Sequence, residues 1–133
     1  MNLYLDIDGV IIKQGKPANG LREFLKFAAE HHNCYWLTTH CRNGGNRTVE
    51  HLQNFLPPEL LELTKKIQPK DWVSLKTEAI DFRQPFLWLD DYMLTAEKQA
   101  LEKRGCLQNY ILIDLIKNPN QLEDIVKNLS GAN

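Results

Sequence analysis

Short apolar runs alternate along this chain with segments of helical periodicity, and this alternation constrains the fold more than any other feature. The runs lie at residues 3–7, 34–37, 86–89 and 110–113. Strands with apolar residues at successive positions are buried on both faces, as in parallel sheets that carry helices on each side. The sequence therefore predicts an α/β fold with a doubly wound, Rossmann-like parallel sheet.

The helical segments show one apolar stripe each. Leu21 begins the clearest stripe, with further apolar residues three, four and seven positions later. The same reasoning predicts helices near 49–56, 95–104 and 122–129. Residues 59–77 give no clear period, and a short helix and an irregular loop are both compatible with them. With 133 residues and no repeat or linker, the chain is expected to form a single domain over 1–133.

Composition and charge exclude several classes of function. The net charge of −1 predicts no broad attraction to nucleic acid or to a membrane. No apolar stretch approaches the ~20 residues of a membrane span, and the N-terminus lacks the basic region of a signal peptide. The three cysteines are widely spaced and odd in number, which favours free thiols and a cytoplasmic location.

Polar residues follow three of the predicted strands. Asp6-Ile7-Asp8-Gly9 follows the first, Thr38-Thr39-His40 the second and Asp90-Asp91 the third. Ligands of open parallel sheets bind outside the carboxyl ends of the strands. Either acidic pair alone is also common turn chemistry, but their joint occurrence is more specific. Carboxylates gathered at one edge require a cation, and hard oxygen ligands select Mg²⁺.

These segments resemble the motifs of the haloacid dehalogenase (HAD) superfamily. Residues 3–10, LYLDIDGV, are similar to its first motif, in which an apolar strand leads into DxDx(T/V). Residues 35–38, YWLT, resemble the second motif, and residues 86–91, FLWLDD, resemble the fourth. The third motif is a single lysine, for which Lys76 is better placed than Lys70. WLTTH, the Asn/Gly/Arg loop after it and WLDD are also similar, more weakly, to a compact subgroup associated with RNA-repair proteins.

The resemblance implies roles for these residues. Asp6 would be the nucleophile that forms an aspartyl-phosphate, and Asp8 the general acid and then the base. Lys76 would offset the charge of the intermediate, and Thr38 would bind a phosphoryl oxygen, with Thr39 as the alternative. Mg²⁺ would be held by the Asp6 carboxylate, the Asp8 backbone carbonyl, Asp90 and, directly or through water, Asp91.

Other polar residues leave alternatives open. The loop from Arg42 to Arg47 could cradle a second phosphate at a helix N-terminus, or be a flexible loop with Asn46 as the helix cap. Arg42 is accordingly a candidate substrate-binding residue. The spacing of His40, Cys41 and His51 matches no zinc pattern, so structural roles are expected for them.

The predicted function is that of a Mg²⁺-dependent phosphatase without a large cap. Family members carry caps at two insertion points, and residues 10–19 and 57–75 are too short for a folded cap. An open site favours a large phosphorylated substrate, such as a nucleic-acid end or a phosphoprotein. The alternative is a non-catalytic module that binds Mg²⁺ and phosphate and acts with a protein partner. A phospho-acceptor domain of the receiver type fits less well, because its acidic pair normally belongs to the first strand and its acceptor to a later one.

Overall fold

A parallel sheet forms the centre of the molecule. The computed structural model describes residues 1–131. Five strands lie in the order β5-β4-β1-β6-β7, and every pairing between neighbours is parallel. The strands are β1 (Asn2–Leu5), β4 (Asn33–Trp36), β5 (Gln68–Pro69), β6 (Phe86–Asp90) and β7 (Tyr110–Leu112).

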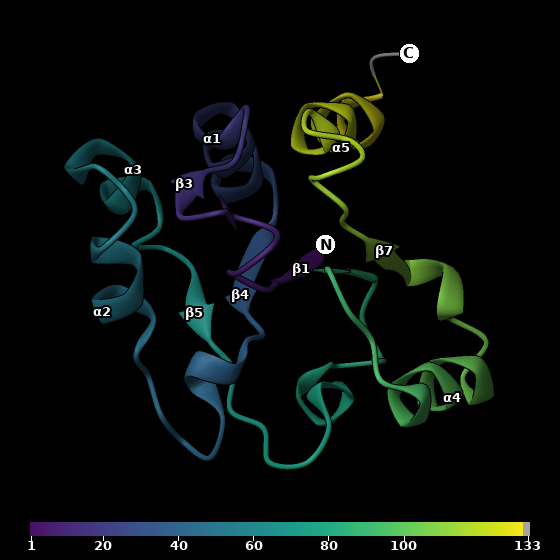
Figure 1. Cartoon of the computed structure of the whole chain (residues 1–133). Coiled ribbons are helices and arrows are strands. Elements are labelled where there is room, and N and C mark those ends of the chain that lie inside the picture. Colours follow the sequence, from purple (N-terminus) through teal and green to yellow (C-terminus); the bar gives the residue numbers. More distant parts are fainter. Residues whose placement is uncertain (132–133) are drawn as a thin grey trace.

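Helices cover both faces of this sheet (Figure 1). One face carries α1 (Leu21–His31), α2 (Thr48–Gln53), α3 (Pro58–Leu63) and α5 (Gln121–Ser130), whose apolar residues share one core cluster. The other face carries α4 (Thr95–Lys103), whose Leu101 belongs to a second cluster with Trp88. Residues 1–131 also contain three 3₁₀ turns: η1 (Thr39–Cys41), η2 (Lys76–Ala79) and η3 (Leu107–Asn109). The predicted α/β, Rossmann-like fold is confirmed.

The elements follow the apolar pattern closely. In α1 the buried residues are Leu21, Phe24, Leu25 and Ala28, the predicted stripe. The predicted strands and helices all occur, with ends shifted by one to a few residues. Backbone pairing and helix capping, rather than apolar character, decide where each element stops, which explains the shifts.

Two strand pairings were not predicted. The fifth strand of the sheet, β5, has two residues, and it pairs with Tyr35 and Trp36 of β4. An antiparallel hairpin joins β2 (Ile12–Lys13) to β3 (Lys16–Pro17) within the short flap after the first motif. Strands of two residues are too short to show a hydrophobic period, so no sequence pattern could indicate them.

The register of the sheet brings the predicted acidic residues together. Leu5 of β1 lies opposite Trp36 of β4 and Leu89 of β6. The next residues along β1 and β6, Asp6 and Asp90, therefore meet at the carboxyl edge of adjacent strands. The two segments where a cap could be inserted contain only the β2–β3 hairpin and the short elements α3 and β5, so no large cap covers this edge.

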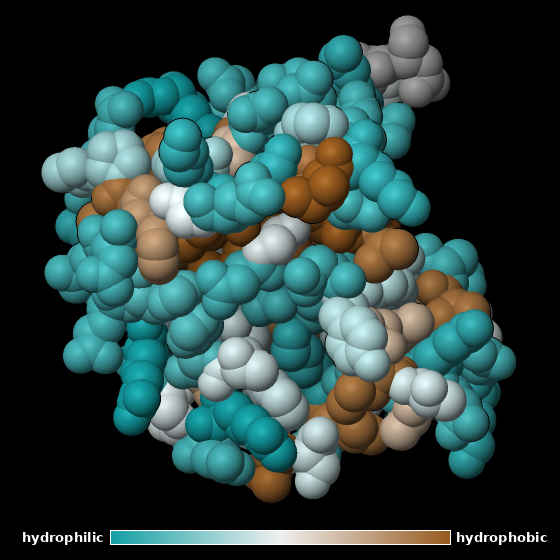
Figure 2. Space-filling model, viewed as in Figure 1, coloured by the Kyte–Doolittle hydropathy of each residue, from teal (hydrophilic) through white to brown (hydrophobic). Residues whose placement is uncertain are grey.

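Among residues 1–131, no helix has both the length and the apolar character needed to cross a bilayer. In the view of Figure 2 the exposed face is mainly hydrophilic, and hydrophobic residues show in smaller areas between hydrophilic ones.

Candidate active site

Lys76 lies between two carboxylates at the carboxyl edge of the sheet. Its Nζ is 2.7 Å from Oδ2 of Asp90 and 3.4 Å from Oδ2 of Asp6. The side chains of Lys76, Asp6 and Asp90 are only 11%, 12% and 1% exposed. At such low exposure, charges interact far more strongly than at the surface, and the three groups form one electrostatic unit.

A third carboxylate extends this group. Oxygen atoms of Asp6, Asp90 and Asp91 lie within 4.8 Å of one another. Carboxylate oxygens at this spacing suit a hard divalent cation that retains several waters, as Mg²⁺ does. The donor set therefore fits the predicted ion, and Asp6, Asp90 and Asp91 are the side chains that could hold it.

Burial and neighbouring charges shift the pKa values of two members of this group. Burial, together with the negative charge of Asp6, raises the pKa of Asp90 to about 8, even though Lys76 acts in the opposite direction. Burial alone would lower the pKa of Lys76, but the nearby Asp6 and Asp90 carboxylates outweigh it and raise the pKa. Lys76 is thus positively charged at neutral pH, whereas Asp90 keeps its proton there.

Glu97 holds the backbone of the lysine in place. This glutamate is buried in the first turn of α4. One carboxylate oxygen accepts a hydrogen bond of 2.7 Å from the Lys76 backbone N–H, and the other accepts one of 2.9 Å from the Leu94 backbone N–H. The sequence reasoning missed Glu97. Its place in a helical first turn predicts the contact with Leu94, but nothing local predicts the contact with Lys76.

Glycine is required after the second aspartate of the first motif. Gly9 has φ +86, and a Cβ atom placed there would lie only 2.7 Å from Cγ of Asp91. The loop after β1 therefore packs its backbone directly against the Asp91 side chain, which a larger residue would displace.

The Asp8 side chain points to a different set of partners. Its Oδ2 lies 3.1 Å from Nε2 of His40, and its Oδ1 lies 2.8 Å from Nε2 of His51. Desolvation tends to raise the pKa of Asp8, but hydrogen bonds from His51 and His40 outweigh it and lower the pKa. Only structural roles were expected for the two histidines, because the spacing of His40, Cys41 and His51 matches no zinc pattern.

A cavity of about 280 Å³ opens beside the acidic group. Its lining includes Thr39 but not Thr38. Thr38 is buried at the end of β4, and its Oγ1 accepts a 3.5 Å contact from the backbone N–H of His40. The complete lining is Asp6, Thr39, Trp72, Lys76, Asp90, Asp91, Tyr92, Leu94 and Glu97. Of the two threonines, Thr39 is therefore the one next to open space.

Trp72 and Arg42 support the wall of this cavity. The indole N–H of Trp72 donates a 2.9 Å hydrogen bond to the Thr38 carbonyl. The Arg42 guanidinium lies over the Trp72 ring, 5.2 Å from its centroid, and its Nε donates a 2.7 Å hydrogen bond to the Val73 carbonyl. Arg42, predicted as a substrate ligand, thus fixes the segment that leads to Lys76.

The two candidate lysines lie in different surroundings. Lys70 places its Nζ over the ring of Tyr35, 4.6 Å from the centroid, whereas Lys76 contacts Asp6 and Asp90 directly. The structure brings together Asp6, Lys76, Asp90 and Asp91, with Thr39 on the wall of the adjoining cavity.

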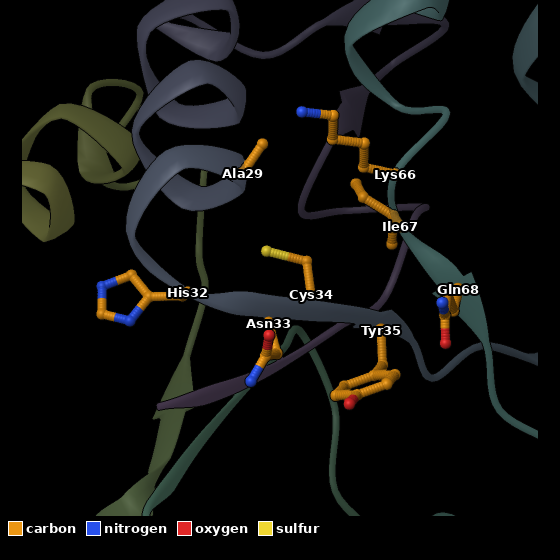
Figure 3. A pocket seen from close by; sticks show the side chains of 8 residues that line it. All are labelled: Ala29, His32, Asn33, Cys34, Tyr35, Lys66, Ile67 and Gln68. Atoms are coloured by element: carbon orange, nitrogen blue, oxygen red, sulfur yellow. The ribbon is translucent and has the colours of Figure 1, made fainter.

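A second cavity lies at the opposite end of β4 (Figure 3) and has a volume of about 210 Å³. The Cys34 side chain points toward α1 there, while Tyr35 points to the other face of the sheet. Burial raises the pKa of Cys34 to about 11, so it remains a protonated thiol at neutral pH. This supports packing rather than nucleophilic chemistry for Cys34.

Comparison with known proteins adds no identification. The chain matches no protein-family model, no curated protein and no solved structure. Its function must be inferred from its own residues and their geometry.

Proposed function

We propose that the chain is a Mg²⁺-dependent phosphomonoester hydrolase that acts through an aspartyl-phosphate on Asp6. The observation that carries this proposal is the position of Lys76, whose Nζ lies within 3.4 Å of Asp6 and 2.7 Å of Asp90. Phosphoryl transfer depends mainly on positioning and on neutralising charge. A nucleophilic carboxylate, a cationic side chain and a set of oxygen ligands are the parts that this chemistry requires.

The first half-reaction would use Asp6 as the attacking group. Its Oδ1 already accepts a 2.8 Å hydrogen bond from the Ile7 backbone N–H, while Oδ2 faces Lys76. A carboxylate oxygen of Asp6 would bond to phosphorus as the ester P–O bond breaks, and the leaving oxygen would take a proton. Mg²⁺ bound by Asp6, Asp90 and Asp91 would neutralise negative charge on the phosphoryl oxygens.

Asp8 would protonate the leaving oxygen and then accept a proton from the water that releases phosphate. Its side chain is 57% exposed and follows Asp6 by two residues, so it can face a leaving group that points to solvent. To act in this way Asp8 has to exchange at least one histidine contact for the substrate, because both of its oxygens have imidazole partners.

The open site supports a large substrate. Only short elements occupy the positions where a cap could lie, so a phosphorylated nucleic-acid end or a phosphoprotein could reach Asp6. We include the end of an RNA chain in this proposal because of the resemblance to the subgroup associated with RNA repair.

The experiment that tests this function measures phosphate release from an aryl phosphate and from 3′- and 5′-phosphorylated oligonucleotides, with Mg²⁺ and with a chelator. The variant Asp6→Asn should abolish activity. The control Asp124→Asn changes an exposed aspartate on α5 in the same chemical way and should behave as the native chain.

A second candidate is a non-catalytic module that binds Mg²⁺ and a phosphorylated partner. It is favoured by the Asp8 contacts, because hydrogen bonds from His40 and His51 lower its pKa and oppose its service as an acid. If the native chain binds Mg²⁺ but releases no phosphate from any of these substrates, the hydrolase proposal is contradicted and the binding module is the remaining candidate.

A further inference from the structure

The contacts of Asp8 form a site of their own. Its two oxygens face Nε2 of His51 at 2.8 Å and Nε2 of His40 at 3.1 Å. The imidazole rings are stacked, with centroids 4.0 Å apart and planes inclined by 26°. Three potential ligand atoms from three separate segments therefore converge within 4.8 Å of one another.

We propose that Asp8, His40 and His51 form a binding site for a divalent transition-metal ion such as Zn²⁺, separate from the oxygen-only site of Asp6, Asp90 and Asp91. Two imidazole nitrogens and one carboxylate match the protein ligands of zinc sites that keep a fourth position for water. Imidazole suits Zn²⁺, whereas sites built from oxygen alone suit Mg²⁺. The two clusters thus differ in the class of ion that they select.

The observed distances leave room for such an ion after an adjustment of the side chains. Ligand atoms about 2.0–2.1 Å from a tetrahedral zinc ion lie roughly 3.3 Å from one another. Nε2 of His51 is now 2.8 Å from Oδ1 of Asp8, and Nε2 of His40 is 3.1 Å from Oδ2. One ligand atom of each residue lies within 4.8 Å of the others, so the side chains have to shift to bring one carboxylate oxygen and both nitrogens to a common ion. Each histidine would then hold its proton on Nδ1 and offer the Nε2 lone pair to the metal.

The backbone holds the two histidines together without help from Asp8. The Arg47 N–H donates to the His40 carbonyl at 3.1 Å, and the His51 N–H donates to the Arg47 carbonyl at 3.0 Å. The His51 ring also packs edge-on against Phe55, with centroids 5.2 Å apart. This scaffold places both rings before any ion binds, which lowers the conformational cost of binding.

Solvent can reach the site. The side chains of His40 and His51 are each 22% exposed, and that of Asp8 is 57% exposed. A shallow hollow of about 270 Å³ adjoins the histidines and is lined by His40, Arg47, Glu50, His51 and Asn54. A hydrated ion therefore has a path to the three ligands.

Zinc binding can be measured on the full chain by isothermal titration calorimetry, in saturating Mg²⁺ and with a reductant that does not bind metals. The native chain is expected to bind one Zn²⁺ at this site. His40→Ala and His51→Ala should each weaken binding by at least about tenfold. The matched control is His31→Ala, which removes an exposed imidazole at the end of α1 and should leave binding unchanged.

A second measurement leaves the chain unaltered, in case a variant fails to fold. The ring resonances of His40 and His51 in NMR spectra should shift on addition of Zn²⁺, while those of His31 should not. Absence of zinc binding by the native chain, native-like zinc affinity in both His40→Ala and His51→Ala, or unshifted His40 and His51 resonances would overturn the inference.

The outcome is independent of the proposed hydrolase. Zinc binding is scored without any substrate, so a chain that binds Zn²⁺ but releases no phosphate would retain this site and lose the catalytic proposal. If both hold, Zn²⁺ should inhibit phosphate release, and His51→Ala should reduce that inhibition, because the ion would occupy the carboxylate of Asp8.

Discussion

The ammonium group of Lys76 lies 2.7 Å from one carboxylate oxygen of Asp90, in a pair whose side chains are 11% and 1% exposed. The same oxygen of Asp90 is 3.3 Å from the indole nitrogen of Trp88. The Tyr92 backbone N–H donates to the other oxygen at 3.3 Å. Asp90 is thus held on several sides, and Lys76 supplies the one positive charge among these contacts.

Replacing this lysine tests its proposed role in neutralising charge. Lys76→Met should lower kcat by about 10²–10³-fold, the range for loss of one preorganised group that stabilises transition-state charge. Lys70→Met should stay close to native, since Lys70 packs on Tyr35. Steady-state kinetics on an aryl phosphate gives the comparison. Equal losses in both variants would remove Lys76 from the mechanism.

Glu97 should matter for stability as well as for position. In Glu97→Gln the amide N–H₂ would face a backbone N–H of Lys76 or Leu94, which leaves one buried hydrogen bond unmade. The expected loss in free energy of unfolding is about 1–3 kcal/mol. Urea unfolding followed by circular dichroism measures it, with the exposed Glu102→Gln on the same helix as control. No difference between the two variants would refute a structural role for Glu97.

Gly9 and Gly105 separate the effect of a steric clash from that of backbone strain. Both have positive φ, +86 and +67, but a Cβ at Gly9 would lie 2.7 Å from Cγ of Asp91 and one at Gly105 would meet nothing within 4 Å. Gly105→Ala should lose about 1 kcal/mol of stability through strain alone. Gly9→Ala should lose more and should also weaken Mg²⁺ binding, because Asp91 has to move. Calorimetric titration with Mg²⁺ checks the second effect, and equal affinities in the two variants would contradict it.

The raised pKa of Asp90 predicts how the effect of Mg²⁺ on stability depends on pH. Its pKa is raised from 3.8 to about 8 in the folded chain. Between these values the folded state keeps a proton that the unfolded state releases, so the free energy of unfolding falls as pH rises. Mg²⁺ bound as proposed would favour the ionised carboxylate and offset this loss, so it should raise Tm more near pH 8 than near pH 5. Thermal melts at both pH values test this prediction. In Asp90→Asn the rise in Tm caused by Mg²⁺ should be similar at the two pH values.

The dependence of turnover on the leaving group tests whether Asp8 acts as a general acid. A basic alkoxide leaving group needs a proton, whereas an activated aryl oxide needs little help. Asp8→Asn should therefore reduce turnover of an alkyl phosphate by about 10²–10⁴-fold and that of an activated aryl phosphate much less. Parallel losses on the two substrates would assign Asp8 a positioning role instead.

The sheet and its acidic edge could be predicted because their signals are local. Strands β1, β4 and β6 are continuous apolar runs, and a parallel sheet places the residues after each strand at one edge. Asp6 and Asp90 meet for that reason, and their meeting does not depend on the conformation of the loops. The two-residue β5 gives no such signal, since its pairing depends on the path of the chain after α3.

The contacts around Asp8 and Lys76 depend on how loops pack, and the spacing of residues in the sequence does not predict loop packing. His40 and His51 reach Asp8 across 32 and 43 residues, and Glu97 reaches Lys76 across 21. The two residues of each contact belong to separate segments, and they meet only after the sheet has fixed the positions of both segments. The turn of η1 likewise buries Thr38 and leaves Thr39 on the cavity wall.

Because β1 lies in the middle of the sheet, Asp6 and Lys76 are expected to differ in the free energy at which their segments open. Asp6 follows a strand paired on both sides, and its amide proton should exchange with solvent only on global unfolding. Lys76 belongs to a 3₁₀ turn held by side-chain hydrogen bonds, and such segments open locally at lower free energy. Warming should therefore abolish the proposed activity reversibly a few degrees before the protein melts, while Asp6 keeps its native position.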